Sequence, residues 1–292
     1  MIGQYLDWAK KLYKLNKDAI KQRLTFKSLD EYTNLPQLVH DQARCCFVLS
    51  TGRCGTAFLT NILELSKEVR CEHRPTPELI YPSRLAYDSS TIDNSKFEIG
   101  IDMARYELVE SAFLRDQVYV ETNNKITFFA PYLARVFKQS IFIHLVRHPA
   151  DFVRSGILRK WYSGKDYHDV GRIVPTNGSF GNWDRMTQIE KIAWLWNETN
   201  QFVENFKASL GDPNRIMFAK AEDLFSGTEA VVRIFKLLQL EPLLEKKINR
   251  VMRRPVNAQR SGDFPKYQQW NSEQKAQLKK YAVLSAKYGY EL

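Results

Sequence analysis

Residues 45–63, which read CCFVLSTGRCGTAFLTNIL, decide the fold of this chain. The segment 45–50 is a short, almost wholly apolar run, as is typical of a strand buried on both faces of a parallel sheet. After Gly52 and Gly55, apolar side chains recur at three- and four-residue steps from Phe58 onward, which is the period of a helix. The stretch therefore predicts a strand, a tight turn and a helix.

The turn between this strand and this helix has the features of an anion site. Gly52 and Gly55 permit positive φ and a close approach of the backbone to a phosphate. Arg53 adds a permanently charged donor fork, and Thr56 adds a hydroxyl where the helix dipole favours negative charge. The alternative is an ordinary strand-to-helix turn with a capping threonine. A Walker A loop is disfavoured, because Gly55 is followed by Thr56 and Ala57 rather than by lysine.

A second strand-to-helix junction lies in residues 140–162. The apolar run 140–146 predicts a strand, Arg147 stands at its carboxyl end, and Pro149 suits the first turn of a following helix. Ser155 lies within that helix, eight positions after Arg147. Ligands of open parallel sheets bind at the carboxyl ends of strands, so an arginine and a hydroxyl here favour a phosphate monoester.

The remaining pattern alternates strands and helices. Further strands are predicted over 117–122 and 215–221, and further helices over 124–138, 149–162, 186–210, 227–239 and 272–287. Such alternation indicates an α/β fold, a single domain of three layers (α/β/α) with a central parallel sheet. The tryptophans of the 186–210 segment, Trp194 and Trp196, are interpreted as core rather than as a stacking platform for an adenine.

Composition restricts the function classes without choosing among them. The chain has 292 residues and a formal net charge of +10, which indicates a polyanionic or phosphorylated partner. Its four cysteines show neither a CxxC motif nor a paired histidine spacing, so no metal site is expected and a reducing, cytoplasmic location is favoured. Residues 1–40 are predicted to form a helical extension, with an amphipathic helix over 4–24, and residues 41–292 the main domain. The basic face of that helix suits packing on the domain or, as an alternative, contact with a membrane.

Four segments, in order, resemble the sulfotransferases that use 3′-phosphoadenosine 5′-phosphosulfate (PAPS). STGRCGTAFL (50–59) is similar to their 5′-phosphosulfate loop, and HLVRHPADFVRS (144–155) to their 3′-phosphate motif. FAKAEDLFSGTEAVVRIFKLLQL (218–240) is similar to a Tyr-Glu-Asp-Leu strand end and the helix after it, and RSGDFPKYQQWNSEQ (260–274) to the late segment that closes over the nucleotide. The resemblance covers the chain from about residue 45 to its end and implies a P-loop-like sulfotransferase fold.

The resemblance also implies roles for residues of the donor site. Arg53, with the backbone N–H groups of Cys54, Gly55 and Thr56, would contact the sulfuryl and 5′-phosphate oxygens, without a metal or a covalent intermediate. Arg147 and Ser155 would bind the 3′-phosphate that distinguishes PAPS from ATP. A further clamp is implied at Arg260, Ser261 and Gly262. Many members carry hydroxyl side chains where this chain has Cys54 and Ala57, so one hydroxyl contact is expected to be missing.

The acceptor requires a general base, for which there are three candidates. Glu72 and His73 follow the first helix, where several branches of the family carry a catalytic Glu or a His-Glu-Pro segment. Glu121 ends the strand 117–122, where the cytosolic branch carries Lys-Thr-His, and the histidine position itself would be Asn123. His73 and Glu72 are ranked above Glu121, since a histidine titrates nearest neutral pH.

The expected function is therefore sulfuryl transfer from PAPS to a hydroxyl or amine of a small-molecule or carbohydrate acceptor, with release of adenosine 3′,5′-bisphosphate. The alternatives are a P-loop-type kinase of a small substrate and a non-enzymatic nucleotide- or RNA-binding protein. A nucleic acid partner is not expected, because aromatic residues are not interleaved with basic clusters. The segments 72–116 and 162–183 are predicted as loops that shape the acceptor pocket. Their acids and aromatic residues suit a polar, a cationic or a sugar acceptor.

Overall fold

The computed structural model describes residues 34–88, 93–176, 183–253 and 264–292. Five parallel strands form its sheet: β1 (Cys45–Leu49), β2 (Val69–Glu72), β3 (Val118–Glu121), β4 (Ser140–Val146) and β5 (Ile216–Lys220). Their order across the sheet is β2-β3-β1-β4-β5. β1 is therefore central, with β3 on one side and β4 on the other.

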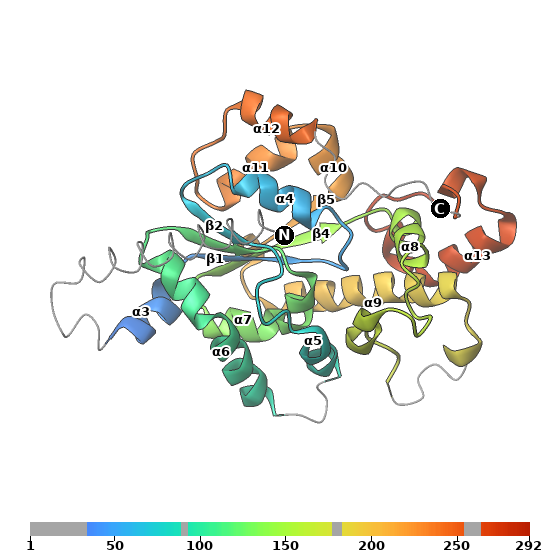
Figure 1. The fold of residues 1–292 in the computed structure, drawn as a ribbon, viewed down its shortest axis with the longest axis horizontal. Coiled ribbons are helices and arrows are strands. Elements are labelled where there is room, and N and C mark those ends of the chain that lie inside the picture. Colours follow the sequence, from blue (N-terminus) through green and yellow to red (C-terminus); the bar gives the residue numbers. More distant parts are fainter. Residues whose placement is uncertain (1–33, 89–92, 177–182, 254–263) are drawn as a thin grey trace, which may run out of the picture.

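Helices cover both faces of this sheet (Figure 1). In the view of Figure 1, α4 (Thr56–Leu63), α10 (Ala221–Ser226), α11 (Glu229–Leu237) and α12 (Glu245–Met252) lie above the sheet. Below it lie α5 (Ile80–Tyr87), α6 (Asn94–Phe113), α7 (Ala130–Val136) and α9 (Gln188–Ser209). In the same view, α3 (Leu35–Gln42) lies at the left end of the sheet, and α8 (Pro149–Ile157) and α13 (Ser272–Tyr281) lie at the right end. The predicted α/β class with a parallel sheet and two helical layers is confirmed.

Short 3-10 helices complete the connections. They are η2 (Asn124–Phe129), η3 (Tyr167–Gly171), η4 (Trp183–Arg185), η5 (Pro213–Arg215), η6 (Tyr267–Gln269) and η7 (Val283–Ser285). η2 begins three residues after β3 ends. The segment 124–138, which was predicted as one helix, is this 3-10 helix followed by α7.

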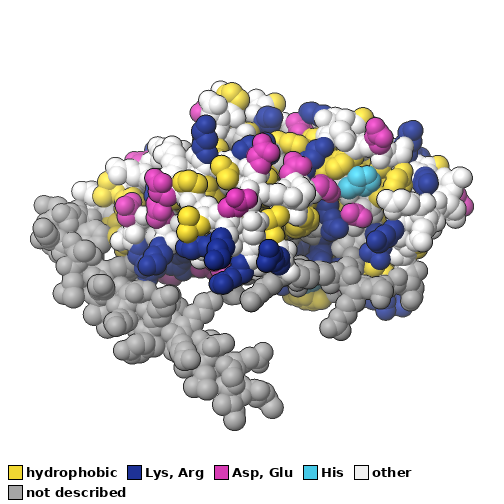
Figure 2. Space-filling model, turned by 90° about the horizontal axis from the view of Figure 1, so that it is seen from above, with side chains coloured by type: hydrophobic (Ala, Val, Ile, Leu, Met, Phe, Trp, Pro, Cys, Tyr) yellow, Lys and Arg dark blue, Asp and Glu magenta, His cyan; other side chains and the backbone are white. Residues whose placement is uncertain are grey.

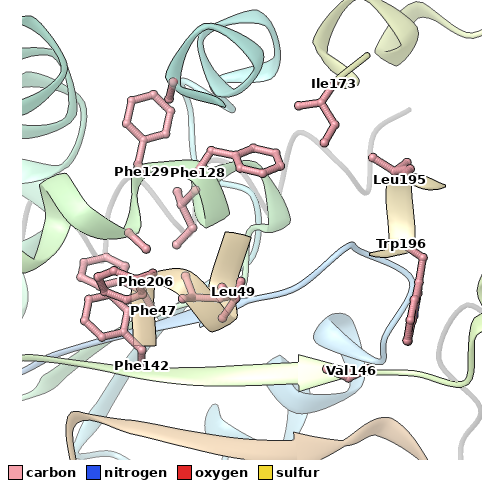
Figure 3. Packing of buried hydrophobic residues seen from close by; sticks show 14 of the residues in the cluster. Phe47, Leu49, Phe128, Phe129, Phe142, Val146, Ile173, Leu195, Trp196 and Phe206 are labelled. Carbon is pink, nitrogen blue, oxygen red and sulfur yellow. The ribbon is translucent and has the colours of Figure 1, made fainter. Parts of the chain in front are cut away.

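Alternation along β1 divides the core into two layers. Cys46 and Val48 pack toward α4 and α11, whereas Cys45, Phe47 and Leu49 pack toward the opposite layer of helices. Figure 3 shows the second layer, where Phe47, Phe142 and Phe206 lie together. Every residue of β1 is buried, which explains why its sequence is a continuous apolar run rather than an alternating one.

The structure corrects one part of the predicted organisation. The segment 72–116 is not a loop, because it contains α5 and the 20-residue helix α6. The strand β2, which precedes it, was not predicted either. The buried stripe of α6 contains Phe97, Ile101, Arg105, Val109 and Ala112, so an arginine interrupts the apolar pattern that identifies a helix.

The N-terminal part of the predicted organisation lies mostly outside the described residues, including the helix expected over 4–24. Within the described part, α3 places Leu35 and Val39 in the core of the domain. No helix in the described ranges combines the length and the apolar character needed to span a bilayer.

Candidate active site

The turn after β1 has a backbone that only glycine adopts easily. Gly52 has φ +80° and Gly55 has φ +85°, and Arg53 between them also has positive φ, at 59°. A Cβ atom on Gly52 would lie 3.0 Å from the Cγ of Asn124, and one on Gly55 would lie 2.7 Å from the Cζ of Phe225. A non-glycine residue with positive φ costs energy, and such strain gathers at functional sites.

The side chain of Cys54 points into the core and fixes this turn. Its Sγ donates to the carbonyl of Gly52 at 3.1 Å and lies 3.2 Å from the Oγ1 of Thr51. Burial raises the pKa of the Cys54 thiol to about 11, so the thiol is neutral at pH 7. Cys54 can therefore offer a ligand its backbone N–H but not its side chain.

The junction after β4 lies directly beside this turn. β1 and β4 pair in register from Cys45 opposite Ser140 to Leu49 opposite His144, so the two junctions leave the same edge of the sheet. The Nη1 of Arg147 donates to the carbonyl of Arg53 at 2.9 Å. The Nε of Arg53 donates to the Oγ of Ser155 at 3.2 Å. The structure thus brings together the two anion sites that the sequence predicts separately.

A third arginine, which the sequence analysis did not identify, belongs to this group. The Nη1 of Arg159 donates to the Oγ of Ser155 at 3.0 Å and to the carbonyl of the same residue at 3.2 Å. Arg159 follows Ser155 by four residues, and this helical spacing is the signal that could have revealed it. Ser155 itself is fully buried and holds both guanidinium groups in place.

The three guanidinium groups repel one another. Burial, together with the charges of Arg159 and Arg147, lowers the pKa of Arg53 to about 10. Arg53 remains cationic at pH 7, so the group stores like-charge repulsion that a bound anion would relieve. We call Arg53, Arg147 and Arg159 the arginine cluster.

Residues from α9, from α10 and from the C-terminal segment hold the second junction in position. The backbone N–H of His148 donates to the Oε1 of Glu222 at 2.9 Å, and the hydroxyl of Tyr290 donates to its Oε2 at 2.8 Å. The indole Nε1 of Trp196 donates to the carbonyl of Arg147 at 2.9 Å. Trp196 is buried, as predicted, and Figure 3 shows it next to the end of β4 at Val146. Glu222 belongs to the AEDL segment, so its side chain supports the site without entering it.

Two of the three candidate bases are engaged elsewhere. Glu121 is fully buried and accepts from the Nε and Nη2 of Arg105 at 2.6 and 2.9 Å, and from the hydroxyl of Tyr119 at 2.9 Å. Both of its oxygens are thus committed to a structural ion pair in the α6 layer. Glu72 accepts from the Nε of Arg70 on its own strand at 3.2 Å. This arrangement argues against Glu121 as a base and leaves His73 as the best placed.

His73 lies near the turn after β1. Besides burial, the charges of Arg74 and Arg53 lower its pKa, while Glu78 acts in the opposite direction. Burial is the largest cause of the lowered pKa. The imidazole is therefore neutral at pH 7, the state that a base requires.

A chain of hydrogen bonds determines which nitrogen of His73 carries the proton. The hydroxyl of Thr60 donates to the carbonyl of Thr56 at 2.9 Å, so its oxygen accepts from the hydroxyl of Thr122, 2.7 Å away. Having donated its proton there, Thr122 accepts from the Nδ1 of His73 at 2.8 Å. The Nε2 of His73 is then unprotonated and able to accept a proton.

A cavity of about 440 Å³ opens beside the turn after β1. Its lining includes Gly52, Arg53 and Arg159 at the arginine cluster, together with Lys125 and Trp161. Its volume is typical of a small-molecule site. Part of the lining, 165–168 and 171–173, comes from the predicted loop 162–183, which contains η3, whereas residues 177–182 of that loop lie outside the described residues.

The implied clamp at Arg260, Ser261 and Gly262 also lies outside the described residues. The nearest described residue after it is Phe264, whose carbonyl accepts from the Nε of Arg154 at 3.0 Å. Arg154 is the neighbour of Ser155 on α8, so the described chain resumes against α8.

Comparison with solved structures identifies the fold. A sulfotransferase domain from the curacin biosynthetic pathway matches with a TM-score of 0.51 and 13% identity, over 86% of this chain and 99% of that domain. The fold is that of a sulfotransferase domain. The resemblance in fold that the sequence predicts is thereby confirmed.

Two further solved sulfotransferases are similar. A sulfotransferase from Alicyclobacillus acidocaldarius has a TM-score of 0.48 and 11% identity, over 85% of this chain and 97% of its own. The sulfotransferase domain of the Synechococcus PCC 7002 olefin synthase has a TM-score of 0.47 and 14% identity, over 87% and 97%. No protein-family model matches the sequence, and no curated protein matches it.

Proposed function

We propose that this chain transfers a sulfuryl group from PAPS to a hydroxyl or amine of a small acceptor, with His73 as the base. The observation that carries the proposal is the direct contact between the two predicted anion sites, from Arg147 to the carbonyl of Arg53 and from Arg53 to Ser155. A single nucleotide that bears both a 5′-phosphosulfate and a 3′-phosphate would satisfy both.

The residues present fit such a donor. The arginine cluster supplies permanent positive charge, and the Gly52–Gly55 turn brings backbone N–H groups and the start of α4 to the same place. Arg53 and the N–H groups of Cys54, Gly55 and Thr56 would hold the 5′ end. Arg147 would bind the 3′-phosphate, with Ser155 orienting Arg53 and Arg159. We place Arg260, Ser261 and Gly262 in the proposed clamp on the resemblance alone.

PAPS supplies an activated sulfuryl group, whose bond to the bridging phosphate oxygen breaks as the new bond to the acceptor forms. Arg53 and the helix start stabilise the negative charge that develops on that bridging oxygen. The Nε2 of His73 takes the proton of the acceptor, and Thr122 keeps the ring in the required tautomer. Thr60 and Thr56 extend this support into α4.

Calorimetry with adenosine 3′,5′-bisphosphate tests the donor site. Charge-assisted hydrogen bonds to a phosphate contribute about 1.5–3 kcal/mol, so Arg147→Ala should weaken the binding of the bisphosphate by about ten- to a hundredfold. Adenosine 5′-phosphate, which lacks the 3′ group, should lose much less. Arg135→Ala, an exposed arginine of α7 that pairs with Glu98, is the matched control and should change neither affinity.

Two results would overturn the proposal. One is the absence of bisphosphate binding to the full chain. The other is an equal loss of affinity for the bisphosphate and for adenosine 5′-phosphate in Arg147→Ala. Tighter binding of ATP with Mg²⁺ than of the bisphosphate would instead indicate a kinase. Binding of RNA that weakens steeply with salt would indicate a nucleic acid partner. The face in Figure 2 carries charges of both signs, so it offers no uniformly basic surface for such a partner.

A further inference from the structure

The cavity holds a second group of charges, separate from the arginine cluster. Arg74 pairs with Glu78 at 3.3 Å, and Arg172 pairs with Asp166 at 2.8 Å and also with Asp169. The guanidinium of Arg172 further lies 4.4 Å from the ring centre of Trp161. Both guanidinium groups of this second group are therefore neutralised by partners within the protein.

Lys165 lines the cavity without an ion pair among the described residues, but it is exposed. Lys125 is the half-buried lysine of the lining that has no such partner. It follows β3 as the second residue of η2 and lines the cavity. Within residues 34–88, 93–176, 183–253 and 264–292, no carboxylate makes an ion pair with its ammonium, because Glu78 and Asp166 pair with the two arginines. A partly buried ammonium without a counter-ion is costly, and an anion in the cavity would remove that cost.

The charges around Lys125 define its surroundings. Burial is the largest cause that lowers its pKa, to about 8, and Arg172 and Arg74 add to the effect, whereas Asp166 and Glu78 oppose it. The neighbouring His168 has a lowered pKa too, in part through the charge of Lys125. At pH 7 Lys125 is still mostly protonated, so it presents a positive charge to the cavity.

Lys125 and Arg53 line the same cavity from different segments, Arg53 from the turn after β1 and Lys125 from η2, and we call the Lys125 part the second end. Besides burial, the charges of Arg159 and Arg147 act on Arg53 and those of the second group act on Lys125, and Asp166 of the second group also acts on Arg159. Charges of both groups act on the pKa of His73: that of Arg53 from the arginine cluster, and those of Arg74 and Glu78 from the second group. The proposed base is thus within range of the charges of both groups.

An apolar wall completes the second end. Phe128 of η2, Ile173 after η3 and Leu195 of α9 converge on the cavity, and Figure 3 shows these three side chains around one space. Trp161 lies in the same wall. A ligand of this end would therefore carry an apolar body together with a group that pairs with a cation.

We propose that the acceptor is a small molecule with an anionic oxygen group that pairs with Lys125, while its hydroxyl or amine lies at His73. This inference rests on the proposed function and adds to it the class of acceptor. It contradicts the cationic acceptor that the acids of the loop segments suggested, because Glu78, Asp166 and Asp169 are all paired with arginines.

Matched ligand pairs test the charge preference directly. The full chain, with and without adenosine 3′,5′-bisphosphate, is titrated at pH 7 with 4-hydroxybenzoate and 4-hydroxybenzamide, and with 4-(hydroxymethyl)benzoate and its amide. 4-Hydroxyphenyl phosphate separates phosphate from carboxylate recognition. The anionic member of each pair should bind about ten- to a hundredfold more tightly, as expected of a charge-assisted contact.

Three variants assign the preference to one side chain. Lys125→Gln should abolish it, and Lys125→Arg, which keeps the charge, should retain it. Lys160→Gln removes an exposed lysine that does not line the cavity and should leave the preference unchanged. Circular dichroism of Lys125→Gln verifies that the variant is folded, and the Lys125→Arg result decides the question if it is not.

The outcomes separate this inference from the proposed function. If the bisphosphate binds but the amides bind as well as the anions, or if no pair member binds, the anionic acceptor is refuted and the donor site stands. Survival of the preference in Lys125→Gln also refutes the inference. If the bisphosphate fails to bind while a Lys125-dependent preference remains, sulfuryl transfer is refuted and the cavity is still an anion site.

Discussion

The ion pair between Arg105 and Glu121 gives the sharpest test of how the structure assigns roles to acidic residues. Both side chains are completely buried, and two hydrogen bonds of 2.6 and 2.9 Å join them. Removing one partner of a buried pair leaves an uncompensated charge and costs about 3–5 kcal/mol. Glu121→Gln retains one amide oxygen as an acceptor, so we expect its free energy of unfolding to fall by about 3 kcal/mol.

A double-mutant cycle isolates the pair. Arg105→Met leaves Glu121 with only the hydroxyl of Tyr119, so its loss should be at least as large as that of Glu121→Gln. Arg105→Met combined with Glu121→Leu leaves no buried charge, and replacing such a pair with apolar residues is often neutral. The single variant Glu121→Leu closes the cycle. We therefore expect the double variant to be more stable than Arg105→Met, with a coupling energy of about 2 kcal/mol or more.

Urea unfolding at pH 7, followed by tryptophan fluorescence, measures each free energy. Calorimetry with adenosine 3′,5′-bisphosphate on the folded variants shows whether the donor site is intact. One result would refute the reasoning: a Glu121→Gln variant with unchanged stability and unchanged bisphosphate affinity, but without turnover. That result would make Glu121 the base and would mean that the ion pair is not structural.

Three further expectations follow from the geometry of the site. Gly55→Ala places a Cβ at φ +85° and 2.7 Å from Phe225, so it should cost about 1–2 kcal/mol in urea unfolding, part of which Phe225→Ala should restore. Thr122→Val should lower kcat without changing bisphosphate affinity, and Thr122→Ser should keep kcat near the wild-type value. In the wild type, kcat/KM should fall as pH decreases through a value below 6.5, where His73 becomes protonated. Lys125→Met should raise the free energy of unfolding at pH 7 by up to about 3 kcal/mol, because folding lowers the lysine pKa from 10.5 to about 8. This gain in stability should shrink between pH 8 and 10.5. A gain that is absent, or that does not change with pH, would contradict the burial of this ammonium.

The proposed donor site rests on signals that are local in sequence. A strand, two glycines around an arginine and a helix occupy residues 45–63, and Arg147 with Ser155 lies within one junction. Their meeting also follows from a general rule, since ligands of parallel sheets gather at strand carboxyl ends. What the sequence could not provide was the strand order that makes β1 and β4 neighbours, because that order depends on packing across the whole sheet.

The prediction for the segments expected to shape the acceptor pocket failed for a different reason. α6 was read as a loop because Arg105 stands in its buried stripe, and that arginine is buried only because Glu121 on β3 neutralises it. The same unseen pairing made Glu121 look like an available carboxylate. Lys125 gave no signal either, because a lysine in a polar segment is usually exposed, and only the fold encloses it.

The strand order also fixes the direction of the proposed reaction across the sheet edge. β1 carries the turn that would hold the group in transfer, and β4, on one side, carries Arg147 for the nucleotide. β3 and β2, on the other side, are followed directly by Thr122 and His73, with Lys125 a little further beyond β3. The proposed nucleotide would occupy the β4 side, which leaves the β3 side of Arg53 to the proposed acceptor. The proposed base His73, the threonine that supports it and Lys125, which has no ion-pair partner in the described part of the chain, all lie on that side, so one arrangement accounts for the proposed donor site, the proposed proton acceptor and the charge proposed for the acceptor.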